Sequence, residues 1–483
     1  MSASAGRVAL TRALLTPEGA ARALLFLTPL AVGFGQALSL HFKGLRASLT
    51  DVFVAALAAL GAYILWRSRP ADGFDILATF RHARRSQPQA VALLVALLVY
   101  LGVIVLSITS AYTRTPVIKE TLKWAEVIVV VCATWGFIRT TRDALWLAWG
   151  VIAGGVAEAL VGCVQSILAA GALGPGGASV RVFGTFDQPN PYGGYLNLAL
   201  PLALALAIFA RDARMRWVAG GASALLLFAQ YLAGSRGALL GLVAALIVIV
   251  ALGWRLERWT ALAALVGTPL VAITWATHLI PRRIENSLLS QFRVNDVSLT
   301  AQVNDANFST IERLAHWVAG IRMFQAHPLL GVGAGNYSAA YPQYQVTGWD
   351  ESLTHAHNYY INVAAETGAL GLIAFLAVVA TALYLAWVAT RATDSHRAGQ
   401  GALVSPDARA IGIGLAAVIV ALCVHNLTDD LFVHAMELQF GLTLGVLLRL
   451  ATPTAPTIPV FPRLGGPSAQ SVETTTLPAS DAR

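Results

Sequence analysis

Charged residues are scarce in this sequence. Asp, Glu, Lys and Arg make up 12% of the 483 residues, against about 25% in an average soluble domain. Hydrophobic residues make up 57%, and the mean hydropathy is +0.65. This composition excludes an ordinary soluble protein. It predicts an all-α integral membrane protein, because a helix satisfies its own backbone hydrogen bonds inside a bilayer.

Cysteine is also scarce, and its positions exclude two further classes. Cys132, Cys163 and Cys423 all fall inside long apolar runs, so neither a disulfide framework nor a cysteine-based metal site is expected. The chain has no nucleic-acid-binding motif. We therefore interpret the net charge of +8 as a sign of topology and of contact with anionic membrane lipids rather than with nucleic acid.

Long apolar runs predict about twelve transmembrane helices, since a span needs roughly 17 or more such residues. The runs are residues 23–40, 51–66, 90–109, 121–138, 144–170, 192–210, 217–233, 238–254, 259–280, 368–389, 409–427 and 432–450. The first run follows Arg7 and Arg12 as a signal peptide would. It lacks a clear small-residue cleavage site after it, so we expect a retained span.

The distribution of basic residues predicts the orientation. With an even number of spans both termini share one side, and 21 of the 33 basic residues fall on that side. The positive-inside rule then places both termini in the cytoplasm. The predicted organisation is nine spans in 1–280, an outer loop with an amphipathic helix in 281–356, three spans in 357–450 and a disordered cytoplasmic tail in 451–483.

The outer loop contains a helical pattern. Ser309-Thr310-Ile311-Glu312 fits a capping box. Apolar residues then recur at helical spacing, at Ile311, Leu314, Ala315, Val318, Ile321 and Phe324. The opposite face carries Arg313, His316, Trp317 and Arg322.

The run His355-Ala356-His357-Asn358 offers the groups best suited to proton transfer. It lies where the polar loop meets an apolar run, and an imidazole exchanges protons near neutral pH. We expect His357 to be the first candidate for a general base and His355 the second. The alternative is that these side chains only anchor a helix end at the membrane boundary.

Several outward-facing residues are expected to bind an anion. Guanidinium groups and helix N-termini both favour negative charge. The candidates are Arg181, Arg236, Arg313, Asn190, Asn358 and Trp317, with Asn190 and Pro191 at the N-cap and first position of a span. Alternatives are an Arg181–Asp187 ion pair and an Arg236 side chain that reaches towards the interface.

Acidic residues give weaker signals. Glu158 lies within a span and is a site candidate or, as we favour, a hydrogen-bonded structural acid. Asp429-Asp430 is the nearest approach to a metal-binding pair, and no outer loop contains an Asp-x-Asp pattern. We therefore expect neither a divalent metal nor another cofactor in the reaction.

The order of motifs resembles the O-antigen ligase superfamily, which includes O-antigen polymerases and bacterial protein O-oligosaccharyltransferases. The motifs are Arg181-Val182-Phe183-Gly184 with Pro189-Asn190, Gly234-Ser235-Arg236-Gly237, Arg313 with Trp317, His327-Pro328-Leu329-Leu330-Gly331-Val332-Gly333-Ala334-Gly335-Asn336-Tyr337, and His355-Ala356-His357-Asn358 with Glu366-Thr367-Gly368-Ala369-Leu370-Gly371. The resemblance covers roughly residues 180–390.

This resemblance implies a GT-C-like glycosyltransferase of the bacterial inner membrane with its active site facing the periplasm. The donor would be a glycan on undecaprenyl diphosphate, and in the ligases the acceptor is a sugar hydroxyl of the lipid A core oligosaccharide. A polymerase or a protein O-oligosaccharyltransferase would use the same donor. An alternative of another class is a transporter of lipid or solute, for which polar groups near mid-membrane and internal repeats would be expected.

Overall fold

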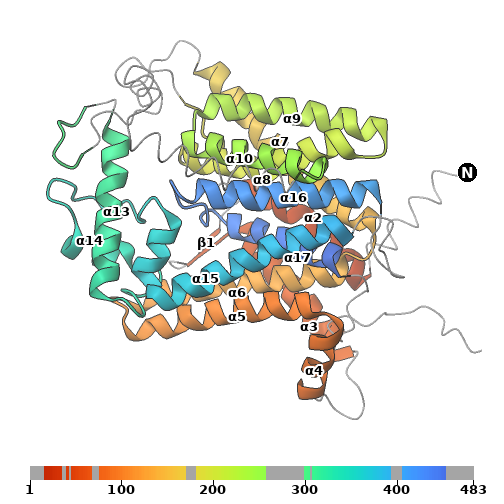
Figure 1. Cartoon of the computed structure of the whole chain (residues 1–483), viewed down its shortest axis with the longest axis horizontal. Coiled ribbons are helices and arrows are strands. Elements are labelled where there is room, and N and C mark those ends of the chain that lie inside the picture. Colours follow the sequence, from red (N-terminus) through yellow and green to blue (C-terminus); the bar gives the residue numbers. More distant parts are fainter. Residues whose placement is uncertain are drawn as a thin grey trace, which may run out of the picture.

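The protein is a bundle of long helices that run roughly side by side, with a smaller helical cap at one end (Figure 1). This computed structural model describes residues 16–34, 40–42, 45–67, 76–169, 181–256, 298–304, 307–392 and 405–452. The helices of the bundle are α2 (Pro17–Phe34), α3 (Leu49–Arg67), α4 (Ile76–Ser86), α5 (Pro88–Leu106), α6 (Arg114–Phe137), α7 (Thr141–Leu168), α8 (Pro189–Phe209), α9 (Ala213–Ala233), α10 (Arg236–Gly253), α15 (Tyr359–Ala392), α16 (Pro406–His425) and α17 (Met436–Ala451). A short 3₁₀ helix, Ser107–Thr109, follows α5, and β1 (Leu40–Phe42) pairs antiparallel with β2 (Leu45–Ala47).

The all-helical membrane architecture predicted from the sequence is confirmed. Eleven of the twelve predicted spans coincide with helices of the bundle. In the part of the chain that the structure describes, six helices are both long and apolar enough to cross a membrane: Pro88–Thr109, α7, α8, α10, α15 and α16. The predicted span 259–280 lies outside the described residues, as does the tail beyond residue 452.

Helices α8 and α16 form the centre of the bundle. In each of these two helices, 78% of an 18-residue apolar stretch is buried inside the protein.

Glu158 of α7 is fully buried within the bundle. It accepts hydrogen bonds from the backbone N–H of Thr185 at 3.0 Å and from the Thr185 hydroxyl at 2.8 Å. Those bonds fit the hydrogen-bonded structural acid that we favoured for this position, because a buried acid needs partners.

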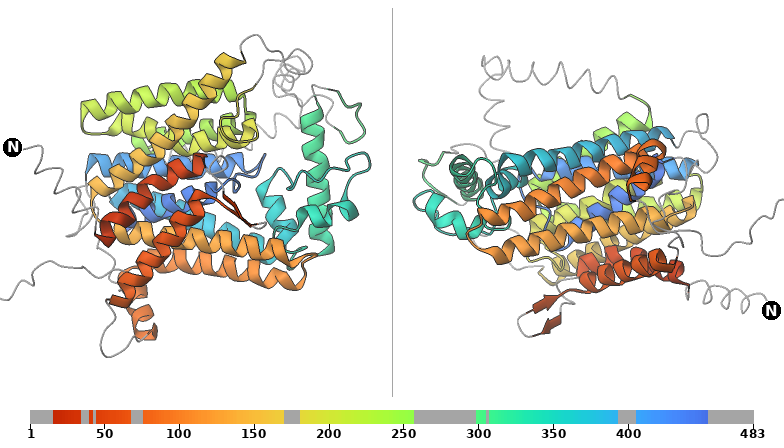
Figure 2. Two further views of the ribbon diagram at one scale, coloured as in Figure 1. Left: turned by 180° about the vertical axis from the view of Figure 1, so that it is seen from behind. Right: turned by 90° about the horizontal axis from the view of Figure 1, so that it is seen from below.

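The cap consists of α13 (Phe308–Ala326) and α14 (Tyr337–Tyr344), which cover one end of the bundle (Figures 1 and 2). The predicted capping box is wrong, because α13 begins before Ser309. Its N-cap is Asn307, and Asn304 and Asn307 exchange side-chain to backbone hydrogen bonds of 2.8 and 3.1 Å. Each asparagine thus fixes the turn that leads into the helix.

The predicted apolar face of α13 is also only partly correct. Its buried residues are Ile311, Ala315, His316, Ala319, Gly320 and Met323, whereas Ile321 is 43% exposed. The helix is therefore rotated so that His316, expected on the polar face, points into the protein. Small residues at 315, 319 and 320 allow this close packing.

A break in α15 joins the cap to the bundle. Gly368 has a φ of +66°, which glycine adopts without strain, and the chain at 328–333 fills the gap. The N–H of Ala369 donates to the carbonyl of Pro328 at 2.8 Å, and the N–H of Val332 donates to that of Ala365 at 2.9 Å. Backbone hydrogen bonds that the broken helix cannot make are thereby supplied from the cap.

The carboxylate of Glu366 strengthens this joint. One oxygen accepts the N–H of Gly335 at 2.9 Å and the other accepts that of Tyr337 at 3.0 Å. Tyr337 is the first residue of α14, where an acid is favourable for the helix dipole. Glu366 therefore orients the start of α14.

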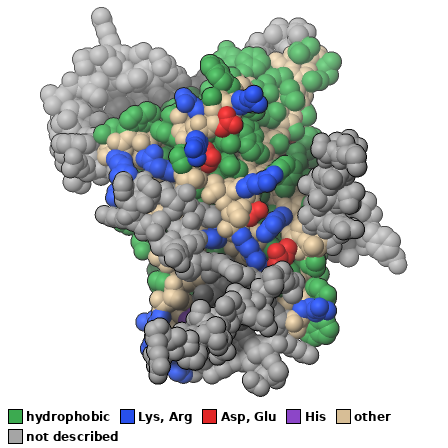
Figure 3. Space-filling model, turned by 90° about the vertical axis from the view of Figure 1, so that its right-hand side faces the viewer, with side chains coloured by type: hydrophobic (Ala, Val, Ile, Leu, Met, Phe, Trp, Pro, Cys, Tyr) green, Lys and Arg blue, Asp and Glu red, His purple; other side chains and the backbone are tan. Residues whose placement is uncertain are grey.

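Charged side chains gather at the end of the bundle opposite the cap (Figure 3). There Arg139 lies 3.2 Å from Glu18, and Arg22 lies 3.7 Å from Asp143. Arg449 donates to the carbonyl of Ile138 at 3.1 Å. The prediction that this end of the bundle lies in the cytoplasm was based on the concentration of basic residues in these segments.

The orientation can be tested by cysteine labelling in intact cells. Thr347→Cys, in an exposed turn of the cap, should react with a maleimide that passes the outer but not the inner membrane. Ser86→Cys, exposed at the end of α4, should react only after the inner membrane is permeabilised. The reverse labelling pattern would show that the predicted topology is inverted.

Candidate functional site

A cavity of about 860 Å³ lies between the cap and the end of the bundle. Its walls come from the segments around residues 181–191, 234–240, 309–317, 353–357 and 425–434. Among the predicted site residues, those that line it are Arg181, Asn190, Arg236, Arg313, Trp317, His355 and His357. Predicted site residues that lie up to 176 positions apart in the sequence, Arg181 and His357, are thus brought together here.

Asn358, the remaining predicted residue, does not line this cavity. Its side-chain oxygen accepts the N–H groups of Tyr360 at 3.0 Å and Ile361 at 3.1 Å, which is the geometry of an N-cap on α15. Its amide nitrogen donates to the carbonyl of Leu427 at 2.9 Å. Asn358 therefore fixes the helix start directly after the histidines.

The backbone that presents the histidines is strained. Leu353, Thr354 and His357 have φ values of +43°, +69° and +50°, in a region that residues with a Cβ rarely occupy. Trp317 donates its indole N–H to the carbonyl of His357 at 3.3 Å, so α13 helps to hold this conformation. Strain of this kind is frequent at functional sites.

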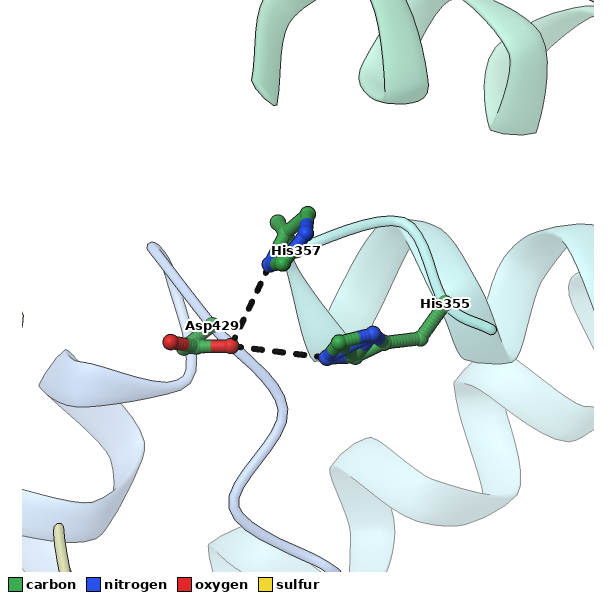
Figure 4. A group of neighbouring side chains, drawn as sticks. All are labelled: His355, His357 and Asp429. Atoms are coloured by element: carbon green, nitrogen blue, oxygen red, sulfur yellow. Dashed lines mark hydrogen bonds and ion pairs between the residues drawn. The ribbon is translucent and has the colours of Figure 1, made fainter. Parts of the chain in front are cut away.

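Both imidazoles converge on one oxygen of Asp429 (Figure 4). Oδ1 of Asp429 lies 3.3 Å from Nδ1 of His357 and 3.4 Å from Nε2 of His355. Burial alone would raise the pKa of Asp429, but the hydrogen bond from His357 and the positive charge of the imidazoles outweigh it and hold the pKa below its usual range. Asp429 is therefore ionised at neutral pH.

This arrangement selects one tautomer of His357. An ionised carboxylate can only accept hydrogen bonds, so Nδ1 of His357 carries a hydrogen, and in the neutral tautomer the lone pair is on Nε2. Nε2 is buried and has no hydrogen-bond partner among the described residues. A ring oriented by a carboxylate through one nitrogen, with the other nitrogen unpartnered, has the geometry that a general base requires.

His355 differs from His357 because both of its nitrogens face acceptors. Nδ1 lies 3.0 Å from the carbonyl of Leu353, and Nε2 faces Asp429. Burial lowers the pKa of His355, which favours the neutral ring. The neutral ring of His355 can donate a hydrogen bond to only one of these two acceptors. If the ring gained a proton, both nitrogens could donate, and the second acceptor would stabilise the charged form.

Each of the three arginines donates a hydrogen bond to an oxygen atom of another described residue. Arg181 donates from Nε to the carbonyl of Ala233 at 2.8 Å. Arg313 donates to the carbonyls of Thr428 and Ser309 at 3.2 and 2.9 Å, and Arg236 donates to the Ser309 hydroxyl at 3.3 Å. Guanidinium groups fixed in this way are suited to binding an anion with little reorganisation.

The predicted capping role of Asn190 is wrong. Helix α8 begins at Pro189, with Gln188 as the N-cap, because Pro189 fits the first helical position as well as Pro191 does. The side-chain oxygen of Asn190 instead accepts a hydrogen bond from Arg181 at 3.2 Å. Asn190 therefore orients the guanidinium group of Arg181 and does not cap the start of α8.

Sequence reasoning treated Asp429 only as a weak metal signal and gave His316 no role. His316 stacks on Tyr341 with ring centroids 4.9 Å apart and lies 5.6 Å from the His357 ring. Burial, together with the two neighbouring histidines, lowers the pKa of His316 to about 4, so it adds no charge beside His357. The polar run from His425 to Asp430 between two apolar segments was the available signal for Asp429.

The same three side chains could also hold a metal ion. One ligand atom each from His355, His357 and Asp429 lies within 4.8 Å of the others, and two imidazoles with a carboxylate are a common ligand set. The expectation of a metal-independent reaction therefore remains a prediction.

Comparison with known proteins gives two matches. Residues 221–376 match the O-antigen ligase family model, a range that includes Arg236, Arg313 and both candidate histidines. The chain is also 28% identical over 268 residues to the exopolysaccharide production protein ExoQ of Rhizobium meliloti (strain 1021). That match covers 53% of this chain and 57% of the relative.

The anion site predicts that inorganic pyrophosphate stabilises the purified protein. A ligand at a hundred times its Kd adds about 2.7 kcal/mol to the unfolding free energy, visible as a higher melting temperature. Arg236→Ala should reduce the shift. Arg322→Ala should not, because Arg322 binds the carbonyls of Tyr344 and Gln345 outside the cavity. Equal shifts in melting temperature in the two variants would show that pyrophosphate binds outside this cavity.

Proposed function

We propose that this protein transfers a glycan from undecaprenyl diphosphate to a sugar hydroxyl of the lipid A core oligosaccharide. The match of residues 221–376 to the O-antigen ligase family model supports this proposal, since that range includes Arg236, Arg313 and both candidate histidines. The observation that carries this proposal is one cavity containing both a carboxylate-oriented imidazole and three fixed arginines. Glycan transfer from a diphosphate needs a base for the acceptor and cationic groups for the leaving group.

The base is His357 in this mechanism. The acceptor hydroxyl attacks the anomeric carbon, and its proton passes to Nε2 of His357. The resulting imidazolium is stabilised by Asp429, 3.3 Å from Nδ1. A direct displacement of this kind inverts the configuration at the anomeric carbon.

The arginines act on the leaving group. As the bond between the anomeric carbon and the diphosphate oxygen breaks, its electron pair remains on the diphosphate. Arg181, Arg236 and Arg313 line the cavity and would neutralise that charge with donors that need little reorganisation. Their planar fork suits phosphate oxygen atoms.

A polymerase is the second candidate within this class. The printed name of the relative is that of an exopolysaccharide production protein, and chain growth would use a second lipid-linked glycan as acceptor. A transporter fits less well, because the functional side chains gather at one end of the bundle beside the cap rather than at mid-membrane. We place the site at the periplasmic face of the inner membrane, with both termini in the cytoplasm.

Transfer by the purified protein tests this function. With an undecaprenyl-diphosphate-linked glycan as donor, wild-type protein in EDTA should glycosylate lipid A core. His357→Ala should lower kcat by about 10²–10⁴, the usual contribution of a general base. Elongation of the lipid-linked glycan instead would identify a polymerase. Loss of transfer in EDTA with recovery on adding Zn²⁺ would assign His355, His357 and Asp429 to a metal.

Asp429→Asn tests the orienting carboxylate. Asparagine keeps an oxygen that can accept the N–H of Asp430, now at 2.9 Å from Oδ1, but it no longer stabilises an imidazolium. We expect kcat to fall by at least about tenfold while the pyrophosphate shift persists. Asp407→Asn is a matched control, since Asp407 accepts the N–H of Arg211 at the opposite end of α16. Equal activity in the two variants would rule out this role for Asp429.

A further inference from the structure

A second cavity of about 370 Å³ adjoins the first. Five residues line both cavities: Thr354, His355, Asp430, Val433 and His434. The second cavity extends from this shared wall into the bundle, between α5, α6, α15 and α17. Its volume lies within the roughly 300–1,000 Å³ of ligand pockets.

Acidic and hydroxyl groups dominate the walls of the second cavity. The acids are Glu120, Glu366, Asp430 and Glu437, and the hydroxyls include those of Tyr100 and Tyr359, which lie 3.4 Å apart. Lys123 is the only ammonium group among the lining residues. The cavity is therefore rich in acceptors and poor in cations, the reverse of the arginine-lined cavity.

Most of these charged groups already have partners. Lys123 forms an ion pair with Glu120 at 2.6 Å and donates to the carbonyl of Phe432 at 3.3 Å. Both oxygens of Glu366 accept backbone N–H groups of the cap. One oxygen of Asp430 accepts the N–H of Phe432 at 2.8 Å. These contacts hold the walls in place.

Glu437 is only partly satisfied by its interaction with Lys123 and by a hydrogen bond to its own backbone. It lies in the first turn of α17 and is 6% exposed. Its Oε2 is buried and has no hydrogen-bond partner within the described residues. A buried carboxyl oxygen without a donor is costly, and its position on a cavity wall indicates that the missing donor comes from a ligand.

We propose that the second cavity binds the acceptor glycan through its hydroxyl groups, with Glu437 accepting a hydrogen bond from a sugar that is neutral or carries an amine. This inference rests on the proposed function and assigns the acceptor to a site separate from the diphosphate. The bound sugar would approach the imidazole pair from the side of His355, which lines both cavities.

The charge of the walls of the second cavity would determine which acceptor sugars bind. Sugar hydroxyls donate to carboxylates, and an amine adds a favourable charge. A carboxylated or phosphorylated sugar would instead meet several acids and a lysine already paired with Glu120. Such repulsion discriminates between acceptors that are otherwise alike.

Transfer kinetics of the full-length protein test this assignment. Two acceptors are compared: a glycan that supports transfer, and the same glycan after its primary hydroxyls have been oxidised to carboxylates. Oxidation should lower kcat/KM by roughly tenfold or more. Glu437→Leu should raise KM for the native acceptor to a similar extent, with KM for the donor and the pyrophosphate shift unchanged. Glu437→Gln, which keeps an acceptor oxygen, should have a smaller effect on KM and reduce the penalty of oxidation.

Glu126→Gln provides a matched control, since Glu126 lies on α6 with Glu120 and Lys123 but lines neither cavity. Transfer with an unchanged acceptor KM in both Glu437 variants would overturn this assignment and leave the proposed function intact. An acceptor KM that rises in EDTA and returns with Mg²⁺ or Ca²⁺ would show that the acids hold a cation instead. No transfer by wild-type protein with any acceptor would overturn the proposed function, and this assignment with it.

Discussion

The break in α15 at Gly368 is the constraint on which the site depends. The chain at 328–333 replaces the helical hydrogen bonds lost there, and Glu366 binds the start of α14. The cap is therefore joined to a membrane helix by backbone hydrogen bonds rather than by side-chain contacts alone. Because Arg313 and Trp317 reach the cavity from that cap, their positions relative to His357 follow from this joint.

The site combines two electrostatic requirements within a small volume. In the proposed reaction, guanidinium groups must be near the diphosphate, while the base must keep its lone pair free. A protonated ring would be repelled by the arginines and could not accept a proton. Asp429 lies 3.3 Å from Nδ1 of His357, so it orients the ring and would stabilise the imidazolium that forms when a proton is accepted.

Much of the architecture could be predicted from the sequence, because long apolar runs are strong signals in a membrane protein. The predicted arginines and histidines were all expected on the outer side of the membrane, which made their clustering at one end of the bundle predictable. Helix starts were less predictable, as Asn307 and Pro189 show, since several nearby residues fit a cap equally well. The pairing of His357 with Asp429 joins residues 72 positions apart and depends on packing that no local pattern encodes.

The way in which the arginines are held has a consequence for turnover. Arg181 and Arg313 are fixed by carbonyl groups of the protein, so their alignment does not depend on the glycan part of the donor. In the proposed reaction the departing lipid diphosphate would keep every group that these side chains are expected to recognise. We then expect release of the spent carrier, rather than bond formation, to be the slow step, with inhibition by this product. Steady activity would require continuous removal of that carrier from the membrane.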